Sequence, residues 1–480
     1  MRPEFLILLA LYIAALVAIG LGFSRRMKSL EDFFLASRSL PAWLIFLSLT
    51  ASWFGATSIL VTTGDAYRRG LGAIWLVGVP AIVTVLIFGV FLAGPIRRLD
   101  IVTLPDLVER RYGQTVRHFA SLLIFWYMVV LASSQMVALG QFLGPFLNVP
   151  YVWSLAAGTG IVLIYLLRGG LFSVVVTDVF QCLFLSGGVL GLAAYLGRRT
   201  PVAGILSAGG TASEGLLDPF SSLGSDLLMA VSFILAWTIS PIAWQRVQAA
   251  GTVKKARQGF LAAAGAFVIL YGLVVLIGIL ARPFLDSREL SHPLISELIL
   301  SEVGRWLGGI LFVAVVAAIL STLDTAVNTG ALTLTRDVYF RLVPCGARGH
   351  LPEVGAGRAA TVVMAALAFL VATRFQSILA ALGLSSEIMA EGLFVPGIAM
   401  IWLRDRRPLA GGLSLALGGG FALAGFLSAL HVLPVRLPAW PHSVPYGVGL
   451  SLAGFVAGYA LDSLRLHGRS SRGPESGPGD

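Results

Sequence analysis

Five polar side chains lie within eight residues of an otherwise apolar segment that runs from Gly308 to Tyr339. The flanking residues are Gly, Ala, Val, Leu, Ile and Phe, which is the composition of a helix inside a lipid bilayer. A charged side chain at membrane depth costs ~3 kcal/mol on insertion scales, so a carboxylate there needs a partner or a function. The polar residues are Ser321, Thr322, Asp324, Thr325 and Asn328.

The spacing of these residues places their oxygens in two neighbouring stripes. At 3.6 residues per turn, Ala318, Ser321 and Thr322 share one helix face, and Asp324 and Asn328 follow on the next. Oxygen donors without Cys or His suit a hard cation. Helix–helix packing through hydroxyl groups is the alternative, and it explains Ser321 and Thr322 but not the carboxylate. We therefore predict a cation site, whose other ligands must come from elsewhere in the chain.

The overall composition identifies the class of protein. Hydrophobic residues make up 57% of the 480 residues, charged residues make up 12%, and the mean hydropathy is +0.87. These values predict an all-α polytopic membrane protein embedded in a lipid bilayer. The net charge of +10 is then a membrane-topology signal and predicts no nucleic-acid partner. None of the six histidines lies deep in an apolar span or forms a spaced ligand pair, so we predict no enzyme activity.

Hydropathy predicts about thirteen transmembrane helices. Of the 34 Lys and Arg residues, 24 fall in one alternate set of loops, which predicts an N-terminus outside and a C-terminus in the cytoplasm of a plasma membrane, as in the bacterial inner membrane. The predicted spans are 4–23, 41–65, 71–94, 119–145, 151–167, 172–196, 224–243, 258–281, 303–335, 359–373, 376–403, 410–430 and 444–463.

Two of these spans are expected to be interrupted helices. The second contains Gly55 among hydroxyl residues, and the seventh contains Ser240 followed by Pro241, so each hydrogen-bond ladder is weakened at mid-membrane. Simple kinks are the alternative. The two spans are five apart, as first members of two five-helix blocks would be. Interrupted helices at matching places in two inverted repeats indicate a transport site.

Several short motifs resemble those of one family, the sodium:solute symporters, which includes carriers of proline, pantothenate, sialate, iodide, choline and sugars. The matches run in order from about residue 30 to residue 340, and after 340 only the hydrophobic pattern matches. They are Phe34-Leu35-Ala36-Ser37-Arg38, Gly64-Asp65-Ala66-Tyr67, Gly169-Gly170-Leu171 with Thr177-Asp178 and Gln181, Gln245-Arg246, and Ala317 to Asp324 closing on Arg336-Asp337-Val338-Tyr339.

The resemblance implies a leucine-transporter type of fold, with two inverted five-helix repeats and alternating access to a midplane site. It also implies a Na⁺ ion between the second and ninth spans. Carried over by position, its ligands are the carbonyl oxygens of Ala51, Phe54 and Ala318 and the hydroxyls of Ser321 and Thr322. Five neutral oxygens suit sodium and keep its binding weak enough for release.

The resemblance also divides the chain into regions. We expect an N-terminal helix and cytoplasmic loop, a transport core of two repeats, two C-terminal helices and a disordered cytoplasmic tail. No domain for signalling follows the last span, although a solute sensor on the same scaffold stays an alternative. The expected boundaries are 1–40, 41–403 with repeats 41–196 and 224–403, 404–467 and 468–480.

The substrate is predicted only by class. Sugar carriers of the family have Glu and Ser where this chain has Val77 and Pro80, and choline carriers have a Trp where it has Trp53. Indole is the best aromatic face for a cation, and carboxylates on the eleventh span add negative charge. These features favour a small cationic or zwitterionic metabolite, with packing roles for the same residues as the alternative. The candidate substrate-binding residues are Trp53, Ser58, Trp237, Ser240, Glu387 and Glu391.

A second cation is expected near Asp178, Ser321 and Asp324. Family members that carry two sodium ions use the acid of the Thr177-Asp178 motif together with ninth-span hydroxyls, and here Asp324 adds a second acid. Two carboxylates in one site resist double ionisation, so the second cation is either sodium or a proton. A structural role for Asp178 and proton-coupled transport both stay open, as do the substrate, the stoichiometry and the oligomeric state.

Overall fold

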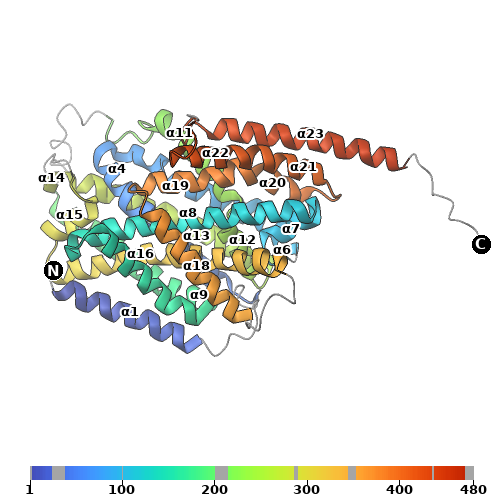
Figure 1. Cartoon of the computed structure of the whole chain (residues 1–480). Helices are drawn as coiled ribbons and strands as arrows, with labels where there is room; N and C mark the ends of the chain where they lie inside the picture. The colour runs from blue at the N-terminus through green and yellow to red at the C-terminus, as the bar shows by residue number, and fades with distance from the viewer. Residues whose placement is uncertain are drawn as a thin grey trace, which may run out of the picture.

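The computed structural model describes residues 3–23, 38–99, 101–200, 215–285, 290–343, 353–434 and 437–470. Within these ranges the chain is helical, with one isolated bridge between Leu40 and Ala250. The long helices lie side by side along one common direction (Figure 1). Large apolar side chains such as Phe91, Trp153 and Ile269 are exposed on the outer surface, as expected where lipid replaces water.

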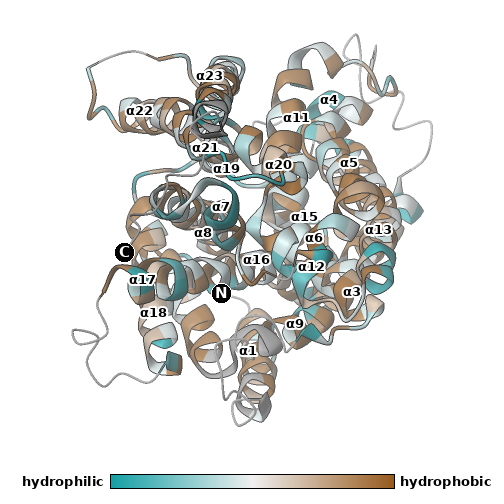
Figure 2. Cartoon of the chain, turned by 90° about the vertical axis from the view of Figure 1, so that its right-hand side faces the viewer, coloured by the Kyte–Doolittle hydropathy of each residue, from teal (hydrophilic) through white to brown (hydrophobic). Residues whose placement is uncertain are grey.

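The first half of the chain begins with a separate helix and continues through the first interrupted span. The helix α1 contacts α9 and α16 at one edge of the bundle, opposite α21 to α23 (Figure 2). The elements are α1 (Pro3–Phe23), α3 (Ala42–Trp53), η3 (Thr57–Val61), α4 (Thr62–Arg69), η4 (Gly70–Trp75), α5 (Gly78–Ile87), η5 (Phe88–Leu92), α6 (Ala93–Arg98), α7 (Leu104–Tyr112), α8 (Gln114–Leu147) and α9 (Tyr151–Arg199).

The second half contains the other interrupted span and the central helix. Its elements are α11 (Leu223–Thr238), α12 (Pro241–Ala249), α13 (Val253–Leu280), α14 (Arg282–Leu285), α15 (Leu294–Ser301), α16 (Arg305–Leu332), η7 (Thr333–Tyr339), α17 (Phe340–Leu342), α18 (Glu353–Ala372), α19 (Ile378–Glu387), η9 (Ile388–Leu393) and α20 (Phe394–Trp402). The short helix α15 lies in the connection between α13 and α16.

The C-terminal region packs on the outside of this core. Its elements are α21 (Pro408–Ser414), η10 (Leu415–Gly419), α22 (Gly420–Ala429) and α23 (Val444–Ser470). The helix α23 extends beyond the other helices at its C-terminal end (Figure 1). Of the predicted disordered tail 468–480, residues 471–480 lie outside the described residues.

The described residues contain nine helices that are long and apolar enough to cross a membrane, or ten when α11 and α12 count as one bent span. Three shorter apolar helices, Pro3–Ile19, Ala42–Trp53 and Tyr151–Ile164, lie within predicted spans one, two and five. The predicted spans 151–167 and 172–196 both fall within α9. The all-α polytopic class is confirmed, and the number thirteen stays a prediction.

The helix α16 forms the centre of the bundle. It packs against α9, α8, α18, α1 and α3, and every residue from Leu311 to Leu332 is buried. A helix that is apolar all around, apart from a few polar side chains, is stable only when neighbours surround it. The polar residues 321–328 are therefore shielded from lipid and face other helices.

Candidate functional site

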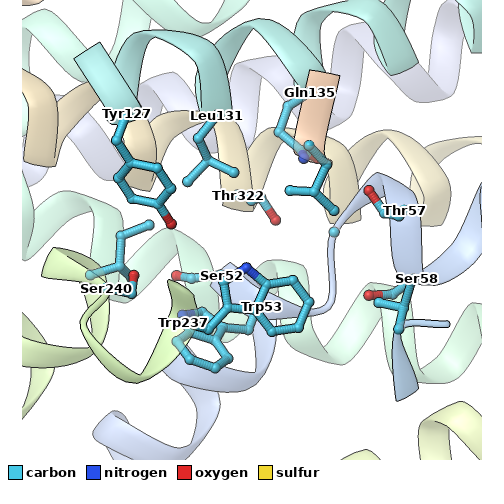
Figure 3. A pocket seen from close by; sticks show the side chains of 14 residues that line it. Ser52, Trp53, Thr57, Ser58, Tyr127, Leu131, Gln135, Trp237, Ser240 and Thr322 are labelled. Atoms are coloured by element: carbon cyan, nitrogen blue, oxygen red, sulfur yellow. The ribbon is translucent and has the colours of Figure 1, made fainter. Parts of the chain in front are cut away.

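The two interrupted spans meet at a cavity in the centre of the bundle (Figure 3). The space inside it that water-sized molecules can occupy is about 50 Å³, which is room for a few water molecules. Its lining contains hydroxyl, amide, indole and aliphatic groups and no acid or base. The lining residues are Ser52, Trp53, Gly55, Thr57, Ser58, Val77, Tyr127, Leu131, Gln135, Trp237, Ser240, Ile242, Thr322 and Leu382.

The first interruption lies at Phe54 and Gly55, as predicted. The helix α3 ends at Trp53, and Phe54 has φ −90° and ψ 61°, outside the helical region. A Cβ at Gly55 would lie 2.3 Å from the Thr322 hydroxyl oxygen, so only glycine permits this approach to α16. The freed N–H of Ala56 donates to the Gln135 side chain at 3.1 Å. The break thus exposes helix ends to the cavity.

The second interruption lies at Ile239 and Ser240, also as predicted. The helix α11 ends at Thr238, Ser240 has an extended backbone, and Pro241 begins α12 at an angle of 41° to α11. Proline fits the first position of a helix because no intrahelical partner is needed there. The Tyr127 hydroxyl lies against the Ser240 hydroxyl at the cavity wall (Figure 3).

Four of the five predicted sodium ligands lie together where α3 meets α16. The Ser321 hydroxyl donates to the carbonyl oxygen of Ala51 at 2.8 Å and to that of Ala318 at 2.9 Å. The Thr322 hydroxyl lies 3.5 Å from the Ala318 carbonyl oxygen and also lines the cavity. Among the described residues, no hydrogen bond joins the carbonyl of Phe54 to this group, although Phe54 directly precedes Gly55.

The chemistry of this oxygen cluster fits a sodium ion. Carbonyl and hydroxyl oxygens are hard donors, and none of the candidate ligands carries a charge. The hydroxyl hydrogen of Ser321 now points between two carbonyls. A cation would take the place of that hydrogen, and the hydroxyl would turn a lone pair toward the ion. The assignment of the five ligands is a prediction that this geometry supports.

Asp178, a predicted ligand of the second cation, is held by two hydroxyl groups and an ion pair. Its Oδ2 accepts from Ser48 at 2.5 Å, from Ser52 at 3.2 Å and from the Arg246 guanidinium at 3.1 Å. Asp178 and Arg246 are each 0% exposed, so this is a fully buried ion pair. A second cation at Asp178 would therefore lie beside the positive charge of Arg246, a residue that appeared in the sequence only as part of a family motif.

The hydroxyl of Thr325 connects this ion pair to the central helix. Arg246 donates to Thr325 at 3.3 Å, and Thr325 lies 2.9 Å from Ser52. Asp324 lies close enough to add its negative charge to the electrostatic field at Arg246. Elements α3, α9, α12 and α16 are thus joined by one polar cluster.

Two indole rings form one wall of the cavity. Trp53 and Trp237 have ring centroids 6.0 Å apart at an angle of 56°, and Phe233 stacks on Trp237 at 4.7 Å. The other two predicted substrate residues on the interrupted spans, Ser58 and Ser240, also line the cavity. The Ser58 hydroxyl is 2.7 Å from the Tyr271 hydroxyl.

Sequence reasoning missed four polar residues of the cavity, which are Ser52 and Thr57 beside the first interruption and Tyr127 and Gln135 on α8. A signal was present, because Ser133, Ser134 and Gln135 interrupt an apolar helix in the same way as the polar run of α16. The predicted residues Glu387 and Glu391 do not line the cavity. Instead, Glu387 accepts a hydrogen bond from Ser443, the residue before α23, and Glu391 packs against Gly447 of α23.

An ion-pair network holds η7, which continues from the C-terminal end of α16, to α7 and α8. Arg117 is 1% exposed and contacts Asp337 at 2.6 Å, Asp106 at 3.1 Å and Glu109. Burial opposes ionisation of Asp106, but Arg336, Arg117 and two backbone N–H groups outweigh it, so the pKa of this carboxyl lies below its usual value. The Asp106 carboxylate therefore stays charged at neutral pH, and the network ties the predicted cytoplasmic ends of three helices together.

Comparison with known protein families decides the class. Residues 33–404 match the sodium:solute symporter family. The chain belongs to this family. The match covers both interrupted spans and the polar run of α16, and it ends just after α20, before the C-terminal helices.

Individual relatives of the family carry different solutes. The chain is 30% identical to a sodium/glucose cotransporter of Vibrio parahaemolyticus, over 82% of this chain and 79% of that protein. It is 24% identical to a high-affinity choline transporter of Drosophila melanogaster, over 87% of this chain and 71% of that protein. A sodium/pantothenate symporter of Escherichia coli is also 24% identical, over 95% and 96% of the two chains.

A solved structure shows the same fold. A Na⁺-coupled sialic acid symporter in an outward-open state superposes with a TM-score of 0.78 at 19% identity, covering 95% of this chain and 97% of that one. The expected sodium:solute symporter fold is thereby confirmed. The chain is a membrane transporter of this family, and the relatives leave its solute undetermined.

Proposed function

We propose that this protein is a sodium-coupled symporter of a small cationic or zwitterionic solute, working by alternating access to the central cavity. The observation that carries the proposal is the position of Thr322. Its hydroxyl belongs to the oxygen cluster with Ala318 and Ser321, and it also lines the cavity between the two interrupted spans. A sodium ion at the cluster and a solute in the cavity would therefore share one wall.

The tight contact between Gly55 and Thr322 provides the physical link between ion and solute. Sodium bound between Ala51 and Ser321 would hold α3 against α16 and fix the interruption beside Trp53. A solute that contacts Trp53 would then bind better when sodium is present, and sodium would bind better with the solute, because such coupling is reciprocal.

The electrostatics of the cavity support a cation or a zwitterion. The carbonyl ends of α3 and α11 carry partial negative charge, and the starts of η3 and α12 carry partial positive charge. The two indole faces of Trp53 and Trp237 attract a cation. The cavity offers no charged side chain that would pair with a strongly anionic solute. Val77 and Leu382 leave one side apolar, which disfavours a sugar with hydroxyl groups on every side.

A thermal-shift screen of the purified full-length protein tests this function. Quaternary amines, amino acids and sugars are each added in sodium chloride and, separately, in potassium chloride of equal ionic strength. We expect a cationic or zwitterionic compound to raise the unfolding temperature only in sodium. Ligand at 100 times its Kd adds ~2.7 kcal/mol to the free energy of unfolding. Equal stabilisation in both salts contradicts sodium coupling, and a sugar as the only ligand contradicts the solute class.

The indole of Trp53 is expected to supply solute affinity. With the ligand from the screen, Trp53→Phe should retain partial binding, because benzene attracts a cation less strongly than indole, and Trp53→Ala should lose at least tenfold in affinity. Sodium binding alone should change little. Trp153→Ala, at a residue 69% exposed on the outer surface, is the matched control. Small and equal effects of both Trp53 changes indicate a packing role.

We also propose the predicted orientation and regions for this symporter. The N-terminus lies outside, the C-terminus lies in the cytoplasm, and residues 41–403 form the transport core. The ion-pair network around Arg117 supports this orientation. Its arginines, Arg117 and Arg336, lie at helix ends that the distribution of Lys and Arg assigns to the cytoplasm.

A further inference from the structure

Two buried glutamates lie outside the ion and solute sites described above. Glu387 ends α19 and is 4% exposed, and Glu391 lies one turn later in η9 and is 0% exposed. Both lie near the middle of the 25-residue apolar run Ile378–Trp402. A carboxylate at that depth is costly, and two at adjacent turns repel each other.

The two glutamates share one hydroxyl group. The Ser443 hydroxyl donates to Glu387 Oε1 and also lies near the Glu391 carboxyl. Both carboxyl oxygens of Glu391 are buried, and among the described residues neither accepts a hydrogen bond of normal geometry. An unpaired buried carboxylate would leave the full desolvation cost uncompensated.

The glutamates fit closely against glycine positions of the C-terminal helices. A Cβ at Gly447, one turn after Ser443 on α23, would lie 2.4 Å from Glu391 Cδ. A Cβ at Gly418 in η10 would lie 2.0 Å from the Glu391 carbonyl oxygen. The Glu391 carboxyl therefore packs against the backbone of α23, while the main chain of Glu391 packs against η10, and both contribute to the contact between the core and the C-terminal helices.

No positively charged side chain on the described elements that pack against α19 and η9 pairs with Glu387 or Glu391. On α8, Arg117 is occupied by three acids and Tyr127 faces the cavity. On α11, Asp226 pairs with Arg69, and on α23, Asp462 accepts from backbone N–H groups of α21. The other titratable groups nearby are His118 on α8, exposed His442 before α23, and Tyr446, Tyr459 and Arg465 on α23. The described parts of η3, η10, α20, α21 and α22 carry no acid or base.

We infer that Glu387, Glu391 and Ser443 form a proton-binding site at the contact between η9 and α23, separate from the sodium site. In the packed arrangement the Glu391 carboxyl carries a proton as a neutral acid. When η9 and α23 separate, water reaches the carboxyl, and the proton leaves to water as the carboxylate forms. Re-packing takes up one proton from water. The proton thus controls how firmly the C-terminal helices hold the eleventh span.

Infrared spectroscopy and thermal unfolding of the purified full-length protein test this inference. At neutral pH, the wild type should show the carbonyl stretching band of a protonated carboxylic acid, and Glu391→Gln should lack that contribution. Gln has nearly the shape of the neutral acid, so the variant should fold. Because the packed state binds a proton that the unfolded chain releases, the unfolding temperature of the wild type should fall by several degrees between about pH 6 and about pH 9.

In Glu391→Gln, the unfolding temperature should depend less steeply on pH than in the wild type. Glu353→Gln, at an exposed glutamate that begins α18, is the control and should keep the slope and the infrared band. Ser443→Ala is a second variant, and it should shift the acid band by removing the donor to Glu387. The inference is overturned if the wild type and Glu391→Gln give the same infrared spectrum and the same pH slope, or if sodium alone removes the band.

Discussion

Thr322→Ala is expected to weaken the apparent sodium affinity at least tenfold, which corresponds to about 1.4 kcal/mol. The change removes one of the proposed oxygen donors and opens a gap beside Gly55, where a Cβ would lie 2.3 Å from the Thr322 hydroxyl oxygen. Folding should survive, because Ala is the best helix former and the lost bond to Ala318 is long at 3.5 Å. Sodium titrations followed by the unfolding temperature measure the effect without a known solute.

Thr335→Ala provides the matched control for this experiment. Thr335 is buried and its hydroxyl also donates to the carbonyl four residues earlier, that of Ala331, at 2.7 Å. It lies beyond α16, in η7, and does not line the cavity. The control should keep the sodium affinity of the wild type. If Thr322→Ala titrates with sodium as the control does, Thr322 is not a sodium ligand.

Ser321→Ala should give an equal or larger loss than Thr322→Ala. The Ser321 hydroxyl contacts carbonyl oxygens of both α3 and α16, so its removal also loosens the contact between the two helices. A double variant that loses no more than the worse single variant would show that the two hydroxyls act on one ion.

The two helix interruptions and the polar run of α16 could be predicted from the sequence because local patterns determine them. The polar run 321–328 is recognisable in an apolar helix, and Gly55 and Ser240-Pro241 interrupt helices through properties of their own backbone. Each of these sequence patterns spans only one or two helix turns. The family motifs then indicate which distant segments meet.

The partners of the charged residues could not be predicted in the same way. The spacing of Glu387 and Glu391 places both on one helix face, but which neighbour that face contacts depends on how α19 and η9 are rotated in the bundle. That rotation results from packing against α11, η10 and α23, far along the chain. Arg246 likewise reaches Asp178 only because α12 turns at Ser240.

The buried pair of Asp178 and Arg246 should be the most sensitive charge interaction in the protein. Removing one partner leaves the other charge buried and unpaired, which costs about 3–5 kcal/mol. We therefore expect Asp178→Asn and Arg246→Gln each to lower the unfolding temperature strongly. The double variant should recover much of the loss, because it leaves no isolated charge. Thermal unfolding of the four proteins gives the coupling energy between the two residues.

A charge count around this pair bears on the proposed second cation. Asp178 and Asp324 bring two negative charges to the cluster, and Arg246 brings one positive charge. One further monovalent cation, sodium or a proton, would make the cluster neutral, and Ser321 lies on the same helix as Asp324. With the solute from the screen in hand, uptake against sodium concentration at several pH values separates the two cations.

A Hill slope near two that falls to one in Asp178→Asn identifies the second cation as sodium. A slope of one, with uptake that follows an inward proton gradient, identifies it as a proton. Arg246→Gln is the sharper variant, because loss of its positive charge should tighten binding of the second cation at Asp178 by Coulomb attraction. A slope of one without a proton effect, together with normal uptake by Asp178→Asn, would show that Asp178 binds no second cation and that the cluster serves only to join α3, α9, α12 and α16.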